Sequence, residues 1–150
     1  MKKIKLITLM LLTFIMTACV NTKIITSSDY NNIMKKDRYE VSDYTNKLAF
    51  SKTSYLATKD DITSYYVELD STTLAKDLYK EEITNANKLY TDVVDKINKD
   101  SEEFSFYEVS TNEEYYVISR IKNTYIVFKS NINNKNNVIN TLRKLKYYNK

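Results

Sequence analysis

Apolar residues recur every seven positions over residues 34–69, at Met34, Val41, Leu48, Tyr55, Ile62 and Leu69. This spacing is typical of one face of a helix, and Ser27, Ser28 or Asp29 could cap its start. Polar residues interrupt the face at 51–52 and 58–59, so we expect two helices with a break near 59–61. The Tyr- and Val-rich run 64–69 also suits a strand, and that alternative stays open.

The apolar pattern of residues 71–99 predicts the longest helix. Its apolar side chains fall mostly at steps of three and four: Leu74, Leu78, Tyr79, Ile83, Ala86, Tyr90, Val93, Val94 and Ile97. Ser71 or Thr72 could cap it. Acidic residues lie early in this segment and lysines lie late, as the helix dipole favours.

The chain then changes to short aromatic and β-branched runs at 104–109, 115–121 and 125–128. These runs predict three antiparallel strands in a meander, with Asn112 and Asn123 supplying the left-handed turn residues. One face would carry Phe104, Phe106, Val117, Ile121, Ile126 and Phe128. The other face would carry Tyr116, Ile118 and Arg120.

The last apolar stripe predicts a closing helix, from Val138, Ile139, Leu142 and Leu145. The expected fold is therefore α+β: N-terminal helices, a three-stranded antiparallel meander and a closing C-terminal helix. We expect this single small domain over residues 29–150.

The first nineteen residues have the order of a secretory signal, with lysines first, an apolar run next and small residues last. From Leu6 to Ala18 the apolar core is 13 residues long. A helix that spans a bilayer needs about 20 residues, so a permanent transmembrane anchor is not expected.

The leader ends in Met16-Thr17-Ala18-Cys19, and Cys19 is the sole cysteine of the chain. This ending resembles the lipobox of bacterial lipoprotein precursors, with Met in place of the more usual Leu. The resemblance implies a signal peptide over 1–18, a diacylglycerol on the Cys19 sulfur and a lipidated tether over 19–28. It places the protein on the outer face of the bacterial cytoplasmic membrane. An ordinary signal peptide with an incidental cysteine, or an uncleaved anchor, is the alternative.

Composition narrows the chemistry. The chain has no histidine, glycine or proline, and its single cysteine would be used for the lipid. Cys/His zinc sites and glycine-rich phosphate loops are thereby excluded, and we expect no metal, no cofactor and no catalytic residue. The absence of Gly and Pro also fits an AT-rich genome, and with the lipobox it indicates a Gram-positive host.

Charge is distributed unevenly. All 19 acidic residues lie between Asp29 and Glu114, whereas residues 115–150 hold eight basic residues and no acid. The basic segment is either solvated or attracted to anionic lipid head groups or wall polymers. The possible interaction surface comprises Tyr116, Arg120 and Lys122, if the sheet face is open, with Arg143, Lys144 and Lys146. Nucleic acid is not expected as a partner of an exported protein.

The run Glu113-Glu114-Tyr115-Tyr116 resembles small staphylococcal lipoproteins named for a Glu-Met-Tyr-Tyr motif, with Glu114 at the Met position. That family implies no particular activity.

We therefore expect a membrane-anchored lipoprotein with a non-catalytic binding or interaction role at the cell envelope, its partner an envelope protein or an anionic polymer. One alternative is an immunity or exclusion lipoprotein of a phage or plasmid. Another is a wall-glycan hydrolase that uses one of the carboxylate pairs at 60–61, 81–82, 102–103 and 113–114.

Overall fold

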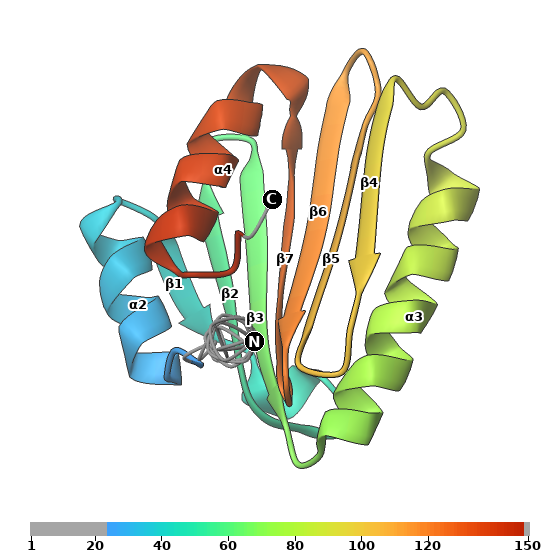
Figure 1. Cartoon of the computed structure of the whole chain (residues 1–150). Helices are drawn as coiled ribbons and strands as arrows, with labels where there is room; N and C mark the ends of the chain where they lie inside the picture. Colours follow the sequence, from blue (N-terminus) through green and yellow to red (C-terminus); the bar gives the residue numbers. More distant parts are fainter. Residues whose placement is uncertain (1–23, 149–150) are drawn as a thin grey trace, which may run out of the picture.

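Residues 24–148 are described by a computed structural model, in which seven antiparallel strands form one sheet (Figure 1). The strands are β1 (Glu40–Asp43), β2 (Ser51–Lys59), β3 (Ile62–Leu69), β4 (Asp95–Asp100), β5 (Phe104–Ser110), β6 (Glu114–Ile121) and β7 (Thr124–Asn131). The helices are α2 (Ser27–Lys36), α3 (Thr72–Leu89) and α4 (Lys135–Lys144), with short 3-10 helices η1 (Thr45–Lys47) and η2 (Ile132–Asn134). The leader and Cys19 lie outside the described residues.

The strand order is β1-β2-β3-β7-β6-β5-β4, so two meanders of consecutive strands join where β3 pairs with β7. Helix α3 carries the chain from β3 in the middle of the sheet to β4 at its far edge. Among residues 24–148, no helix is long and apolar enough to cross a membrane.

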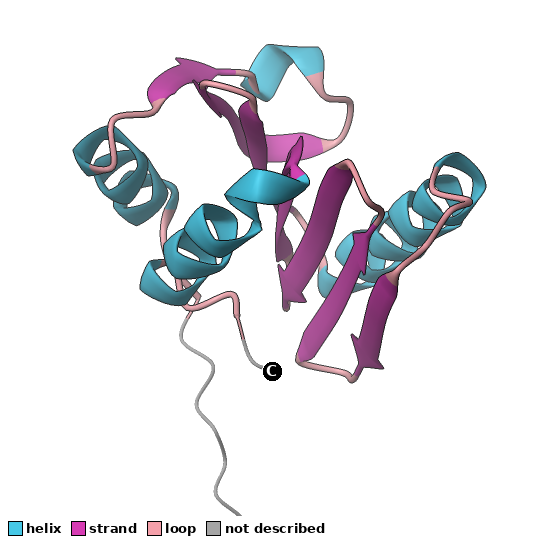
Figure 2. Cartoon of the chain, turned by 90° about the horizontal axis from the view of Figure 1, so that it is seen from above, coloured by secondary structure: helices cyan, strands magenta, loops and turns pink. Residues whose placement is uncertain are grey.

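The helices cover both faces of the sheet, α2 and α4 on one face and α3 on the other (Figure 2). Tyr30, Met34 and Leu142 belong to the larger core beneath α2 and α4. Ala75 and Tyr79 of α3 belong to the second core on the opposite face. Strand alternation decides which residues enter which core, because successive side chains point to opposite faces.

The expected pair of helices over 29–69 is wrong beyond residue 36. Only α2 is helical there, and the chain continues as β1, β2 and β3. The seven-residue recurrence was misleading, because Thr, Tyr, Val and Ile in this segment suit a pleated surface better than a helix. The expected break near 59–61 is the β2–β3 hairpin turn, and the strand alternative for 64–69 is confirmed as β3.

The predicted helix over 71–99 is too long at its end. Helix α3 begins after the cap Ser71, as expected, but it ends at Leu89, and β4 follows. The side chains of Val93 and Val94 are 41% and 65% exposed, so they do not continue the apolar face of α3. The charged sequence of β4 protects this edge of the sheet against pairing with another strand.

The predicted three-stranded sheet is also wrong, because those strands are the β5, β6 and β7 part of a seven-stranded sheet. The class remains α+β, the three strands pair consecutively, and the closing helix is α4. The two predicted face sets are confirmed: Phe106, Val117 and Phe128 enter one core and Tyr116 and Ile118 the other.

The folded region starts earlier than the predicted tether boundary at residue 28. Ile25 is 5% exposed and lies in the larger core, with Ile24 packed against it. Thr26, rather than a residue from 27 to 29, caps α2 through a capping box with Asp29. Of the predicted tether over 19–28, residues 19–23 lie outside the described residues.

Left-handed backbone falls on unexpected residues. Within the described part of the chain, the residues with positive φ are Arg38, Phe50, Asp60, Lys122 and Lys146. Neither Asn112 nor Asn123 is among them, so the predicted turn residues are wrong. Asn123 instead donates its side-chain amide to the Leu69 carbonyl oxygen at 2.8 Å.

Replacement of Phe50 by Gly should raise the free energy of unfolding by about 1 kcal/mol. A non-glycine residue in the left-handed region costs roughly 1–2 kcal/mol, and the greater conformational entropy that glycine loses on folding offsets part of the gain. The Phe50 ring is 75% exposed and its φ is 66°, so little packing is lost. Urea unfolding followed by circular dichroism measures the change. Phe50→Ala, which keeps the Cβ atom, should give no gain, and an equal gain for both variants would refute the conformational explanation.

Candidate functional site

Two lysines bind Asp37 at the end of α2, one through its carboxylate and one through its backbone oxygen. Lys144 of α4 contacts both carboxylate oxygens of Asp37 at 2.7 Å. Lys59 of β2 donates to the Asp37 backbone oxygen at 3.0 Å. Lys36 and Arg38 are the sequence neighbours of Asp37, and both are exposed.

Local structure explains this arrangement. Asp37 is the C-cap of α2, and the left-handed Arg38 turns the chain so that Tyr39 is buried behind it. Met34 and Tyr39 hold the end of α2 in the larger core. Cations at a helix C-terminus also interact favourably with the helix dipole, and therefore this end of α2 attracts Lys144.

Two more cations, Arg143 and Lys146, lie at the end of α4 and just beyond it. Leu142, Leu145 and Tyr147 are fully buried, which leaves Arg143, Lys144 and Lys146 on the surface between them. The Arg143 guanidinium lies 5.0 Å from the centre of the Tyr148 ring. We call the six side chains the basic corner: Lys36, Arg38, Lys59, Arg143, Lys144 and Lys146.

A polar groove of about 280 Å³ runs beside the basic corner. It is lined by Asp37, Tyr39, Lys59, Asp60, Ile62, Asn134, Asn137, Asn140, Thr141 and Lys144. The three asparagines stand at steps of three along α4, from its cap to its middle. This groove supplies amide, carboxylate and ammonium groups to any molecule that approaches the corner.

The structure brings together only part of the predicted interaction surface. Arg143, Lys144 and Lys146 are exposed together, as their spacing around α4 predicts. Lys122 is at the β6–β7 turn, where it pairs with Glu103 at 3.2 Å. Sequence reasoning missed Lys36, Arg38 and Lys59.

Tyr116 and Arg120 are not part of a surface, because α3 covers the sheet face that would have exposed them. Their exposed fractions are 8% and 0%. The Tyr116 hydroxyl donates to the Glu82 carboxylate of α3 at 3.2 Å. The prediction for these two residues required an open sheet, and that condition fails.

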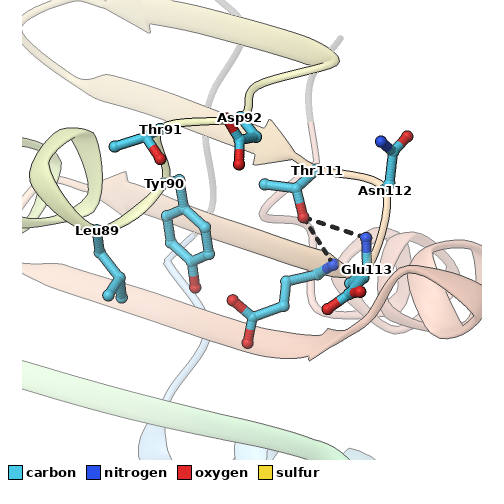
Figure 3. A pocket seen from close by; sticks show the side chains of 8 residues that line it. Leu89, Tyr90, Thr91, Asp92, Thr111, Asn112 and Glu113 are labelled. Atoms are coloured by element: carbon cyan, nitrogen blue, oxygen red, sulfur yellow. Dashed lines mark hydrogen bonds between the residues drawn. The ribbon is translucent and has the colours of Figure 1, made fainter.

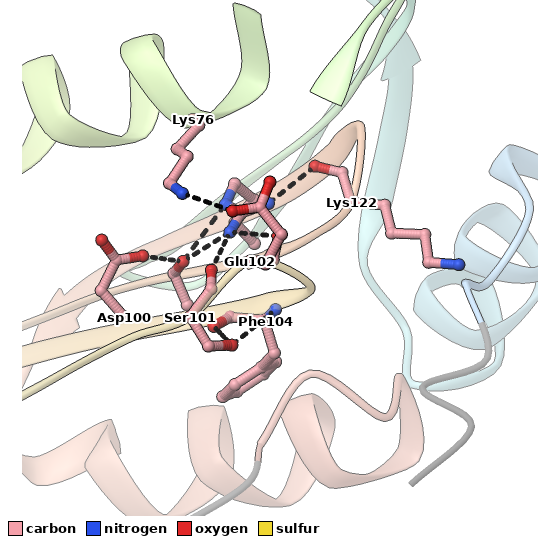
Figure 4. Close-up of polar contacts among 8 residues, drawn as sticks. Lys76, Asp100, Ser101, Glu102, Phe104 and Lys122 are labelled. Atoms are coloured by element: carbon pink, nitrogen blue, oxygen red, sulfur yellow. Dashed lines mark hydrogen bonds and ion pairs between the residues drawn. The ribbon is translucent and has the colours of Figure 1, made fainter. Parts of the chain in front are cut away.

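Arg120 is instead a buried donor that hydrogen-bonds to two turns of the sheet. Its guanidinium donates to the carbonyl oxygens of Ser101, Glu102 and Lys122 at 2.7, 3.1 and 3.1 Å (Figure 4). It also donates twice to the Ser105 hydroxyl, at 3.2 and 2.8 Å. These bonds tie the β4–β5 and β6–β7 turns together.

The carboxylate pairs considered for hydrolysis occupy turns and helix α3. Both oxygens of Asp61 accept hydrogen bonds, from the Asn131 backbone N–H at 2.7 Å and the Asn134 amide at 2.5 Å. Glu114 forms an ion pair with Lys129 at 3.0 Å. These contacts connect the β2–β3 turn to the start of α4 and join β6 to β7.

A hollow of about 340 Å³ separates the end of α3 from the β5–β6 turn (Figure 3). Asp92 lies on one side of it and Glu113 on the other. The Thr111 hydroxyl accepts the backbone N–H groups of Glu113 and Glu114 and so fixes the turn. Within residues 24–148, no three acidic or cysteine side chains gather as a metal site would require.

Glu108 is an acid that sequence reasoning missed. It lies in the middle of β5 and is 1% exposed. The Tyr115 hydroxyl donates to its carboxylate at 2.9 Å, and burial, followed by the Glu108 charge, raises the pKa of Tyr115. The only sequence signal was a single acid among aromatic and apolar residues.

Comparison with known proteins assigns no family: no family model, no curated protein and no solved structure matches the chain.

Proposed function

We propose that the chain is a lipid-anchored protein of the cell envelope, and that its domain binds an anionic envelope component through the basic corner without catalysing a reaction. The observation that carries this proposal is the packing of α4 beside α2. It brings the Lys144 ammonium against the Asp37 carboxylate, whose side chain is 18% exposed, and Lys59 against the Asp37 backbone oxygen, and the other four cations of the basic corner are their exposed sequence neighbours on α2 and at the end of α4.

The position of the corner relative to the tether supports the proposal. Ile25, where the chain enters the domain, shares the larger core with Leu145 and Tyr147. Ile24 lies five residue steps after Cys19, and these steps extend to at most about 18 Å. Helix α2 then leads over ten residues, or about 15 Å, from this entry point to Asp37, so a lipid on Cys19 would keep the basic corner within about 33 Å of the membrane surface, and anionic head groups would attract it once the domain lies against them.

Charge reversal tests the proposal. Changing Arg143, Lys144 and Lys146 to Glu should weaken binding to vesicles that contain phosphatidylglycerol by about tenfold or more, because each basic group near such a surface contributes about 1 kcal/mol. Lys144 contributes less than the others, since it is already paired with Asp37. Sedimentation with vesicles at several salt concentrations measures the effect, with the Cys19→Ala background used to remove the lipid anchor.

A matched variant carries Lys80, Lys88 and Lys99 changed to Glu, with the same change in net charge on exposed residues of α3 and β4. This control should retain most of the binding. Equal losses in both variants would mean that net charge alone controls association, and the basic corner would then have no specific role.

A further inference from the structure

A further pocket lies on the face of the sheet that α3 covers, and it is lined mainly by carbon atoms. Its floor is formed by Tyr65 and Val67 of β3, Tyr125 and Val127 of β7 and Tyr116 of β6. The strand pairing brings these residues together, since Tyr65 pairs with Val127 and Val67 pairs with Tyr125. The rest of the lining is Leu48, before β2, Thr63 of β3, Glu82 of α3 and Lys129 of β7. We call this the tyrosine pocket.

Glu82 is the one carboxylate in the lining of the tyrosine pocket. It accepts a hydrogen bond from the Tyr116 hydroxyl, and among residues 24–148 no Lys or Arg forms an ion pair with it. Burial raises the pKa of Glu82, and burial together with the Glu82 charge raises the pKa of Tyr125 to about 12. A half-buried carboxylate without a cationic partner favours a ligand that brings a positive charge.

Lys129 stands at the rim of the same pocket, and its charge would oppose a cation. Its ammonium, however, lies 3.0 Å from the Glu114 carboxylate. This pair is neutral as a unit, so the Glu82 carboxylate remains the uncompensated charge of the pocket.

The size and lining of the pocket limit the ligand. The cavity volume is about 260 Å³, which is below the usual range for drug-sized ligands and suits a cation with few heavy atoms. A primary ammonium group has three N–H donors to satisfy. Besides Glu82, the side-chain acceptors of the lining are the hydroxyls of Thr63 and of three tyrosines, and the Tyr116 hydroxyl is already bonded to Glu82. A fully alkylated ammonium has no N–H to satisfy and interacts well with aromatic rings.

We propose that the tyrosine pocket binds a small alkylated ammonium ion, with Glu82 supplying the opposite charge and Tyr65, Tyr116 and Tyr125 supplying the aromatic lining. This binding is independent of membrane attachment and of the basic corner.

Titration calorimetry of the full chain in a non-ionic maltoside detergent, with choline chloride as the probe, tests the proposal. Choline should bind saturably, and Glu82→Gln should weaken its binding by about tenfold or more. The neighbouring exposed carboxylate provides the matched control, because Glu81→Gln should leave the affinity unchanged. Tyr65→Leu, which removes a partly exposed ring, should also weaken binding and serves as a second variant if Glu82→Gln is not folded.

Two further probes separate charge from shape. 3,3-Dimethylbutan-1-ol has the shape of choline without its charge, and it should not bind measurably. Binding of this alcohol as tight as that of choline would overturn the proposal, as would an unchanged affinity in Glu82→Gln or the absence of saturation by choline. Tighter binding of butylammonium than of choline would overturn the assignment to an alkylated ammonium group.

Discussion

Replacement of Arg120 by Met is expected to lower the free energy of unfolding by about 3–5 kcal/mol, the size expected when a buried charged hydrogen-bonding network loses a partner. The Met side chain fits a similar space, but the carbonyl oxygens of Ser101, Glu102 and Lys122 lose their donor. The buried Ser105 hydroxyl loses its donor too, and a buried acceptor left without its partner costs about 1–3 kcal/mol. Total stabilities are only about 5–15 kcal/mol, so the loss should be visible as a large shift of the urea midpoint in circular dichroism.

Two control variants show whether the loss of stability comes from the forked geometry of the Arg120 guanidinium. Arg120→Lys keeps the charge but cannot span the same acceptors, so it should also destabilise the domain by more than about 1 kcal/mol. Arg143→Met changes an exposed arginine and should cost less than about 0.5 kcal/mol. If Arg120→Met unfolds at the urea concentration of the unmodified chain, the guanidinium does not hold the two turns together.

Replacement of Cys19 by Ala is expected to abolish lipid attachment and to move nearly all of the chain out of the membrane fraction or leave it as an uncut precursor. The proposed anchor is two acyl chains on one sulfur, and each buried CH₂ contributes about 0.8 kcal/mol, so loss of the sulfur removes the whole lipid contribution to membrane binding. Labelling of growing cells with an alkyne-bearing fatty acid, followed by gel separation and membrane fractionation, measures both effects.

Val20→Ala changes the next residue without removing the thiol, and it should be labelled and retained like the unmodified chain. A Cys19→Ala chain that is still shortened and still pellets with membranes would disprove the lipoprotein assignment and favour an ordinary signal peptide with an incidental cysteine.

Local patterns predicted the C-terminal half of the fold well. In the strands over 104–128, successive side chains point to opposite faces of the sheet, so Val117 and Ile118 were predicted to enter different cores. The strands over 40–59 were not predictable in this way, because Ser and Thr make their burial pattern weak and the chance recurrence of apolar residues at seven-residue steps resembled a helix. Helix α3 was extended too far, since Val93 and Val94 continued its spacing without being buried.

The candidate site was predicted only where it depends on one helix. Arg143, Lys144 and Lys146 follow from the turn of α4, but Lys144 meets Asp37 across 107 residues of sequence, and no local pattern encodes that contact. The burial of Arg120 was missed for the same reason, because the covering helix α3 comes from a distant part of the chain. Contacts between residues far apart in sequence depend on the order of the strands in the sheet, which local sequence patterns do not encode.

The opposite placement of the helices also determines which side of the domain faces outward. The chain enters on the side of α2 and α4, so an anchor at Cys19 would turn this side toward the bilayer and leave α3 facing the cell wall. A solute that diffuses through the wall would then reach the tyrosine pocket directly, without competing with lipid for access.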